Sequence, residues 1–360
     1  MAIRLHGERV NAILNYLSEI GEKSFVSKQL IRSVYKSNIS RFADMNELST
    51  PLRAKLEAKF GPSFSTLTVA NERSADFATK ILFRCTDDQA KLEAVSLSFH
   101  NHNSLCISSQ VGCAFGCSFC ATGKIGFKRQ LTVSNITDQV LHFQSRQRPD
   151  SISFMGQGEP LANPKVFDAI SGLTHPEQFG LSPSRINVST IGIIPGILKL
   201  TECHPACNLT YSLHSPFSDE RQTMMPIEKV YPFRETFKAL DSRIERTGNR
   251  VWIAYLLLEG INDSVDHAKA LVDLISSRSA GVKYLYHINL LPYNRAKDVS
   301  DIMRKVPDIT KFQRTIQKAG IANSYRNSFG KSIDAACGQL YSEHEAATIE
   351  PAGVGRSRIN

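Results

Sequence analysis

The stretch GCAFGCSFCATGKIGF, residues 112–127, places Cys113, Cys117 and Cys120 on one short glycine-flanked loop. Its Cys-x3-Cys-x2-Cys spacing differs from the paired Cys-x2-Cys arrangement of structural zinc sites, and no second suitable pair follows it. Three thiolates suit a 4Fe–4S cluster, because they leave one iron open to a small chelating molecule. The loop therefore predicts a cluster site. The alternatives are three packed thiols, or a zinc ion with one remote ligand.

Strand-like and helix-like segments alternate along the chain from Ser104 onward. The predicted strands are residues 105–108, 151–155, 185–189, 209–213, 251–257 and 285–290, with helices between them such as residues 134–146 and 264–278. This α/β pattern of six βα units predicts a partial (β/α)6 TIM-like barrel. The functional groups of such barrels lie on loops that follow the strands. The cysteine loop and the segments GQGE, STIG, LHS and PYN all follow predicted strands, so we expect one shared site at the barrel mouth.

The first part of the chain has a different pattern. Apolar residues such as Val10, Ile13 and Leu17 recur at helical spacing, and two further helices are predicted at residues 28–35 and 51–60. The later segment 78–98 alternates like a β-hairpin. We therefore expect four parts. These are a small N-terminal helical domain at 1–75, with an RNA-binding or accessory role; a hairpin linker at 76–103; a core at 104–343; and a flexible tail at 344–360.

The overall composition indicates a basic protein that remains in the cell interior. The chain has 43 Lys and Arg against 34 Asp and Glu, a formal net charge of +9, which favours a polyanionic partner such as RNA. Many basic proteins bind no nucleic acid, so charge alone leaves this open. No apolar run is long enough to cross a bilayer, and no signal peptide begins the chain, so we expect a cytoplasmic protein without a membrane partner. In that compartment cysteines remain thiols or metal ligands.

Several motifs together resemble one known family. They are ISSQVGCAFGCSFCATGKIGFKRQLTVSNITDQV, SISFMGQGEPLANPKVFDAI, STIGIIPGI, SLHSPFSDERQTMMPI, AYLLLEGINDS, IDAACGQLY and the N-terminal RFADMNELSTPLRAKL. This set resembles the RlmN/Cfr family, the adenosine-methylating rRNA enzymes of the radical S-adenosylmethionine (SAM) superfamily. TIGIIP, LHSP and FGKSIDAACGQL resemble the Cfr branch. Pro160, however, is typical of RlmN, and Gln157 stands where both branches usually have methionine.

The resemblance implies two cofactors and the residues that hold them. Cys113, Cys117 and Cys120 would bind a 4Fe–4S cluster whose open iron is capped by the amine and carboxylate of SAM. Cleavage of SAM to a 5′-deoxyadenosyl radical suits the substrate, because C2 and C8 of adenine are electron-poor carbons that cannot displace a methyl group directly. The positions that match SAM-binding residues of the family are Gly158, Glu159, Ser189, Ser212, Leu213, His214 and Asn294.

The resemblance also implies a second chemical centre. Cys337 matches a cysteine that is first methylated on sulfur and then carries the methylene group to the adenine. Cys106 matches the partner that attacks the sulfur of Cys337, which releases the methylated base and leaves a transient disulfide. Glu93 matches a proposed proton acceptor for the RNA adduct. Without the resemblance, the two cysteines would be read as inert buried thiols and Glu93 as an exposed strand carboxylate.

The expected activity is methylation of C8 of adenosine 2503 in 23S rRNA, with resistance to phenicols, lincosamides, oxazolidinones, pleuromutilins and streptogramin A as its consequence. Methylation of C2 of the same adenosine is the alternative that Pro160 supports. We expect 23S rRNA and an external electron donor of the flavodoxin or ferredoxin type as partners, and a monomeric chain. Two rival functions are a non-enzymatic RNA-binding protein with a structural metal and a radical SAM enzyme that acts on a peptide or small molecule.

Overall fold

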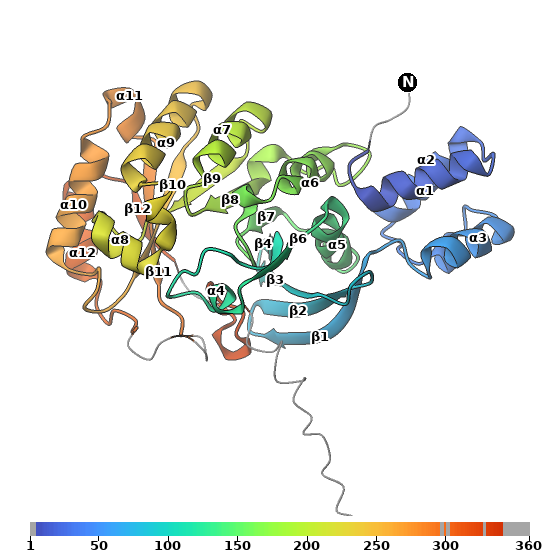
Figure 1. The fold of residues 1–360 in the computed structure, drawn as a ribbon, viewed down its shortest axis with the longest axis horizontal. Helices are drawn as coiled ribbons and strands as arrows, with labels where there is room; N and C mark the ends of the chain where they lie inside the picture. Colours follow the sequence, from blue (N-terminus) through green and yellow to red (C-terminus); the bar gives the residue numbers. More distant parts are fainter. Residues whose placement is uncertain (1–4, 296–298, 300–302, 327–328, 341–360) are drawn as a thin grey trace, which may run out of the picture.

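The computed structural model describes residues 5–295, 299, 303–326 and 329–340 (Figure 1). Its centre is one ten-stranded sheet in the order β1-β2-β3-β4-β7-β8-β9-β10-β11-β12. From β4 onward the neighbouring strands are parallel. Within the described residues β1 and β12 do not pair, so the barrel is open. The predicted α/β partial barrel is thereby confirmed.

The parallel strands follow one another around the barrel in chain order. They are β4 (His102–Cys106), β7 (Ser151–Phe154), β8 (Ile186–Thr190), β9 (Asn208–Ser212), β10 (Val251–Leu257), β11 (Tyr286–Pro292) and β12 (Asn323–Tyr325). The helices of this part are α5 (Val133–Gln144), α6 (Lys165–Thr174), α7 (Ile194–Cys203), α8 (Ser218–Met224), α9 (Phe233–Thr247), α10 (Val265–Ser276), α11 (Ala280–Lys283) and α12 (Thr310–Lys318). The six predicted strands all form, and β12 is an additional parallel strand at the edge.

An antiparallel extension widens the sheet before β4. It consists of β1 (Leu67–Ala75), β2 (Ala78–Cys85) and β3 (Lys91–Phe99), and β3 pairs directly with β4. The hairpin expected at 76–103 is therefore part of the main sheet and does not act as a separate linker. Residues 67–75, which fall within the predicted helical domain at 1–75, instead form β1. Seven consecutive residues of β1 are exposed at the sheet edge, so its sequence carries no alternating pattern.

Three helices form the N-terminal unit, as predicted: α1 (Glu8–Glu19), α2 (Ser24–Tyr35) and α3 (Thr50–Phe60). Figure 1 shows them in blue beside α5 and α6. The Glu8 carboxylate accepts a hydrogen bond from the Ser134 N–H at the start of α5, with a distance of 3.1 Å. A carboxylate at a helix N-terminus is stabilised by the free N–H groups there. This contact fixes the helical unit to the barrel.

The strands of the barrel are apolar because helices and the barrel interior cover both of their faces. Strand β10, for example, has five fully buried residues among its seven, and buried side chains on β9 and β11 lie on either side of it. No helix among the described residues is long and apolar enough to cross a membrane. The predicted tail at 344–360 lies outside the described residues.

Candidate active site at the barrel mouth

The cysteine loop begins from a short hairpin next to the end of β4. Strand β5 (Gln110–Gly112) pairs with β6 (Phe127–Gln130), and α4 (Ala121–Ile125) follows the loop. Gly112 has a φ of +76°, and a Cβ atom there would lie 1.9 Å from the carbonyl oxygen of Gly126. Only glycine fits this crossing. The Cys113 N–H donates to the same carbonyl at 3.1 Å, so the hairpin fixes where the loop starts.

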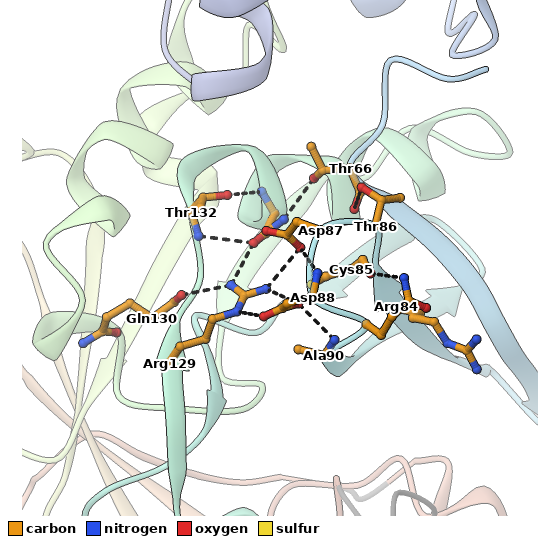
Figure 2. A network of polar contacts seen from close by, with 12 residues as sticks. Thr66, Arg84, Cys85, Thr86, Asp87, Asp88, Ala90, Arg129, Gln130 and Thr132 are labelled. Atoms are coloured by element: carbon orange, nitrogen blue, oxygen red, sulfur yellow. Dashed lines mark hydrogen bonds and ion pairs between the residues drawn. The ribbon is translucent and has the colours of Figure 1, made fainter. Parts of the chain in front are cut away.

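Arg129 joins this two-stranded sheet to the ten-stranded sheet (Figure 2). Its guanidinium donates to the Asp88 carboxylate in the turn between β2 and β3, with an Nη2–Oδ1 distance of 3.0 Å, and to Asn135 of α5 at 3.1 Å. Cys85, Asp87 and Asp88 have potential ligand atoms within 4.8 Å of one another. Because Arg129 already pairs with both aspartates, its guanidinium occupies the carboxylate oxygens that a cation would need, and we assign no metal to this group.

The three cysteines of the loop have the chemistry and spacing that a cluster needs. Burial raises the pKa of Cys113 to about 11 and the pKa of Cys117 well above its usual range, and the neighbouring Cys120 raises both further. The three thiols are thus close enough to interact. Their three sulfur atoms do not all lie within 4.8 Å of one another. Among the described residues, only Cys85, Asp87 and Asp88 form a group of potential metal ligands that close together. This spacing is wide for one zinc ion and leaves room for a multi-iron cluster, which would bind the thiols as thiolates.

A cavity of about 180 Å³ lies next to Cys120. Gly158, Glu159, Ser189, Ser212 and His214 line it from the ends of β7, β8 and β9, as the barrel rule predicts. Gly158 has a φ of +92°, and a Cβ atom would lie 2.4 Å from Cβ of Gln110. A side chain at position 158 would therefore displace a neighbouring residue.

Glu159 is a fixed polar group in the wall of this cavity. Its carboxylate accepts hydrogen bonds from the Thr190 hydroxyl at 2.6 Å and from the N–H groups of Ile191 at 2.9 Å and Leu161 at 3.1 Å. Burial raises the pKa of Glu159 to about 7, although these donors act in the opposite direction. The carboxylate can thus face a cationic ligand group in a defined orientation.

His214 is held as a neutral ring. Its Nδ1 accepts from the Leu256 N–H at 3.0 Å, so Nε2 carries the proton. Burial, together with the nearby Arg221, lowers the pKa of His214 to about 3. Leu213 is fully buried and does not line the cavity; its N–H donates to the Ala254 carbonyl at 3.1 Å. The two adjacent predicted residues therefore have different surroundings.

A larger cavity of about 420 Å³ lies beside the first and shares part of its wall. Asn294 lines this larger cavity, and its buried Oδ1 accepts no hydrogen bond from the described residues. A buried acceptor without a donor is costly, so a ligand ammonium or N–H would satisfy it. The other predicted residues that line this cavity are Cys106, Cys120 and Cys337.

Cys337 lies at the junction of the two cavities, whereas Cys106 lines only the larger one. Burial raises the pKa of Cys106 to about 12, and the proximity of Cys337 contributes to this rise. The Cys337 segment is attached to the helix after the cluster loop. The Ala121 N–H donates to the Gly338 carbonyl at 2.9 Å, and the Thr122 hydroxyl donates to the Leu340 carbonyl at 3.0 Å. The fold thus brings together the thiol of Cys106, at the end of the first parallel strand, and the thiol of Cys337, which follows the last one.

Glu93 is placed near these thiols but not on a cavity wall. It is completely buried on β3, and its Oε1 lies 3.4 Å from Nζ of Lys80. Val95, two residues further along the same face of β3, lines the larger cavity and is paired in register with Cys106. Glu93 therefore lies on the same face of β3 as Val95, which lines the larger cavity, but two residues away from that cavity wall.

Sequence reasoning missed several residues at the junction of the cavities. Arg326 lines both cavities, and its Nη1 lies 3.8 Å from the sulfur of Met155. Its positive charge lowers the pKa of Cys106, although burial has the larger effect. Arg326 follows β12, which was not predicted. The rule that functional groups follow barrel strands would have identified Arg326 if this strand had been recognised.

An open parallel barrel with a three-cysteine loop after its first strand, beside a cavity at the strand ends, is the arrangement of a radical SAM enzyme. The profile of the radical SAM superfamily matches residues 107–273. The profile described as the ribosomal RNA large subunit methyltransferase N-terminal domain matches residues 3–60. The first match covers β5 to α10 and the second covers the three N-terminal helices.

Curated relatives match nearly the whole chain. The ribosomal RNA large subunit methyltransferase Cfr of Clostridium botulinum (strain Loch Maree / Type A3) is 47% identical over 88% of this chain and 92% of its own length. The protein of the same name from Staphylococcus aureus is 44% identical over 92% and 96%. The crystal structure of a radical SAM methyltransferase from Sphaerobacter thermophilus aligns with a TM-score of 0.84 and 30% identity, over 94% of this chain and 99% of that one. The chain belongs to the Cfr family of radical SAM ribosomal RNA large subunit methyltransferases, and its cofactors are a 4Fe–4S cluster and SAM.

Proposed function

We propose that this enzyme methylates C8 of adenosine 2503 in 23S rRNA through a methyl group carried on Cys337. The observation that carries the proposal is the position of Cys337, which lines both the cavity beside Cys120 and the larger cavity that contains Cys106. A carrier at this junction can take a methyl group from SAM on one side and offer it to a base on the other. The Cfr name of relatives at 44–47% identity supports the same activity.

Each cofactor is assigned to its own residues. Cys113, Cys117 and Cys120 would hold the cluster. Gly158, Glu159, Ser189, Ser212 and His214 would hold SAM from the smaller cavity and Asn294 from the larger one, whereas the buried Leu213 would act only by positioning its neighbours Ser212 and His214. When bound, the two cofactors supply the abstraction of a hydrogen atom, which chemistry at an electron-poor ring carbon requires. The protein residues bind SAM and exclude water from the reacting carbon.

The second set of residues transfers the carbon atom. The Cys337 thiolate accepts a methyl group, and after loss of a hydrogen atom that carbon bonds to C8 of the adenine. Glu93 accepts the proton that leaves C8, and the unpaired electron left on the adduct would pass to the bound cluster, which serves as the one-electron acceptor. The Cys106 thiolate then attacks the sulfur of Cys337, and the S–C bond breaks with its electron pair on carbon, which takes a proton to become the methyl group. The resulting disulfide requires an external two-electron reductant.

The larger cavity would receive the target base after it leaves its stack, as in other enzymes that modify bases. The net charge of +9 would hold the RNA backbone around it. We further propose a monomeric, cytoplasmic enzyme that takes its electrons from a flavodoxin-like or ferredoxin-like donor. Methylation at C8 would obstruct antibiotics that bind beside this nucleotide, namely phenicols, lincosamides, oxazolidinones, pleuromutilins and streptogramin A.

Methylation of C2 of the same adenosine is the second candidate, because Pro160 in GQGEP is typical of the RlmN branch. The deciding experiment expresses the chain in a host that lacks its own C2 enzyme and determines the methyl position in 23S rRNA by mass spectrometry. A methyl group at C8, together with reduced susceptibility to phenicols, supports the proposal. A product methylated only at C2 refutes the C8 assignment and leaves the methyl-carrier chemistry intact.

A further inference from the structure

A buried ion pair lies under the segment that contains Cys337. The side chains of Lys80 on β2 and Glu93 on β3 are 2% and 0% exposed, and Nζ of Lys80 lies 3.4 Å from Oε1 of Glu93. In the sheet register Lys80 is opposite Val95, and Val95 is opposite Cys106. Removing two charges from water is costly, and their attraction does not guarantee a net gain in stability. Stability alone therefore does not explain this pair.

The same ammonium group contacts the Cys337 segment. Nζ of Lys80 donates to the main-chain carbonyl of Asp334, three residues before Cys337, at 3.3 Å. The segment approaches β2 so closely that a Cβ atom on Gly330 would lie 2.8 Å from Cβ of Ala78. Lys80 thus joins the Glu93 carboxylate to the backbone that positions the methyl carrier.

We propose that Lys80 is a positioning residue that keeps Glu93 ionised and holds it in register with the Cys337 segment. This inference rests on the proposed function, in which Glu93 accepts the proton from C8 of the adenine. A carboxyl group in a fully buried position favours its neutral form, and an ammonium group in contact with it favours the carboxylate. Only the carboxylate can accept a proton. In that step the C–H electron pair stays in the ring and Glu93 becomes a neutral acid.

After the proton transfer the ammonium remains buried beside a neutral acid. The Asp334 carbonyl still accepts its hydrogen bond, so the charge of Lys80 is not left without a polar contact. The three-way contact therefore suits a site in which one partner changes its charge during each turnover. A lysine engaged only with Glu93 would lose its stabilisation at the moment of transfer.

The test replaces Lys80 in the full-length enzyme with its cluster reconstituted. Lys80→Met is compared with Lys91→Met, which removes a partly exposed lysine from the same strand as Glu93. Each protein is incubated anaerobically with SAM, an electron donor and a 23S rRNA fragment, and three quantities are measured: 5′-deoxyadenosine, methylated Cys337 and the covalent RNA–protein adduct. Lys80→Met should form the first two normally. It should accumulate the adduct, and release of methylated RNA should fall about ten- to a hundredfold, because losing an adjacent opposite charge lowers the ionised fraction of a carboxyl group by that order. Lys91→Met should behave as wild type.

Three further variants separate this role from a general structural one. The double variant Lys80→Met/Glu93→Gln removes both charges, so it does not leave the Glu93 carboxylate buried without its ammonium partner. It should be no more impaired in RNA release than Glu93→Gln alone. Lys80→Arg, which keeps the charge, should restore release in part. If Lys80→Met releases RNA at the wild-type rate, or if the double variant is clearly worse than Glu93→Gln, the role of Lys80 is refuted while the methyl-carrier chemistry stands. If wild-type enzyme forms no methylated Cys337, the proposed function itself is wrong and the role of Lys80 is refuted with it.

Discussion

The two groups of cysteines at the barrel mouth are built in different ways. Cys113, Cys117 and Cys120 lie on one loop, and the hairpin of β5 and β6 fixes that loop by local contacts. Cys106 and Cys337 lie at the two ends of the barrel sequence and meet only because the whole sheet forms between them. The comparison shows why spacing alone indicates the first group, whereas the second is apparent only from family resemblance or from the folded chain.

The two groups of cysteines also correspond to two stages of the proposed chemistry, radical formation and methyl transfer, and each stage can be disturbed separately by mutation. In the proposed mechanism, a change in the loop should remove the cluster and stop every later step. A change in the Cys106–Cys337 pair should leave the cluster in place and stop the transfer of the methyl group. The hydrogen bonds from Ala121 to Gly338 and from Thr122 to Leu340 join the helix after the cluster loop to the segment that contains Cys337.

The largest effect is expected from Cys117→Ala. Cys117 is the most buried of the three loop cysteines, and its loss leaves two thiolates for a cluster that needs three protein ligands. The variant should lose its iron and sulfide and form no 5′-deoxyadenosine. Chemical analysis of iron and sulfide, with chromatography of the SAM products, measures both. Cys203→Ala, an exposed cysteine at the end of α7, is the matched control and should keep full activity. A Cys117→Ala protein with a complete cluster would contradict the assignment.

The next largest effect is expected from Cys106→Ala, which tests the other side of the comparison. Iron content and formation of 5′-deoxyadenosine should be unchanged, because Cys106 lies outside the cluster loop. RNA should remain bonded to Cys337, since the thiol that breaks the thioether is missing. The adduct is measured by intact mass after nuclease digestion. Cys337→Ala should form no adduct at all. Multiple turnovers by Cys106→Ala would show that another group resolves the adduct.

Much of the barrel could be predicted from the sequence because its strands are buried on both faces. Strand β10, predicted at 251–257, forms over those same residues. Strand β12 could not be predicted, since its three residues are polar or only partly buried and carry no apolar run. Because Arg326 directly follows β12, its position on the cavity wall could not be predicted either. Strand β1 was missed for a similar reason, because its side chains are mostly exposed at the sheet edge.

The candidate site shows the same limit. The glycines of the cysteine loop and of GQGE are informative in the sequence because the backbone geometry requires them locally, as at Gly112 and Gly158. The ion pair between Lys80 and Glu93 left no such signal. It depends on the pairing of β2 with β3, and the sequence alone reveals neither the register nor the burial of that pair.

A smaller, graded effect is expected from pH. Burial is the main cause that raises the pKa of Cys106 to about 12, and burial persists in the adduct, where the Cys337 sulfur is an uncharged thioether. The Cys106 thiolate is therefore a minor species near neutral pH. Below that pKa, each unit of increase in pH raises the thiolate fraction about tenfold. The decay of a preformed adduct should accelerate by about the same factor. Rapid-quench measurement of adduct decay at two or three pH values tests this. The iron content should not change over the same range. A flat profile would mean that Cys106 is already ionised when it attacks.

The smallest effect is expected from Gln157→Met, which alters a residue inside a motif. Gln157 is 1% exposed, and neither polar atom of its side-chain amide has a hydrogen-bond partner among the described residues. Replacing an unsatisfied buried amide by methionine of similar length should stabilise the fold by about 1–2 kcal/mol. The melting temperature measured by calorimetry should rise by about 2–4 °C. Gln317→Met, at an exposed position of α12, should not change it. A lower melting temperature, or loss of 5′-deoxyadenosine formation, would indicate that the amide binds a group at the active site. Gln157 would then be a functional residue that its position in the GQGE motif indicates, like the cysteines of the loop.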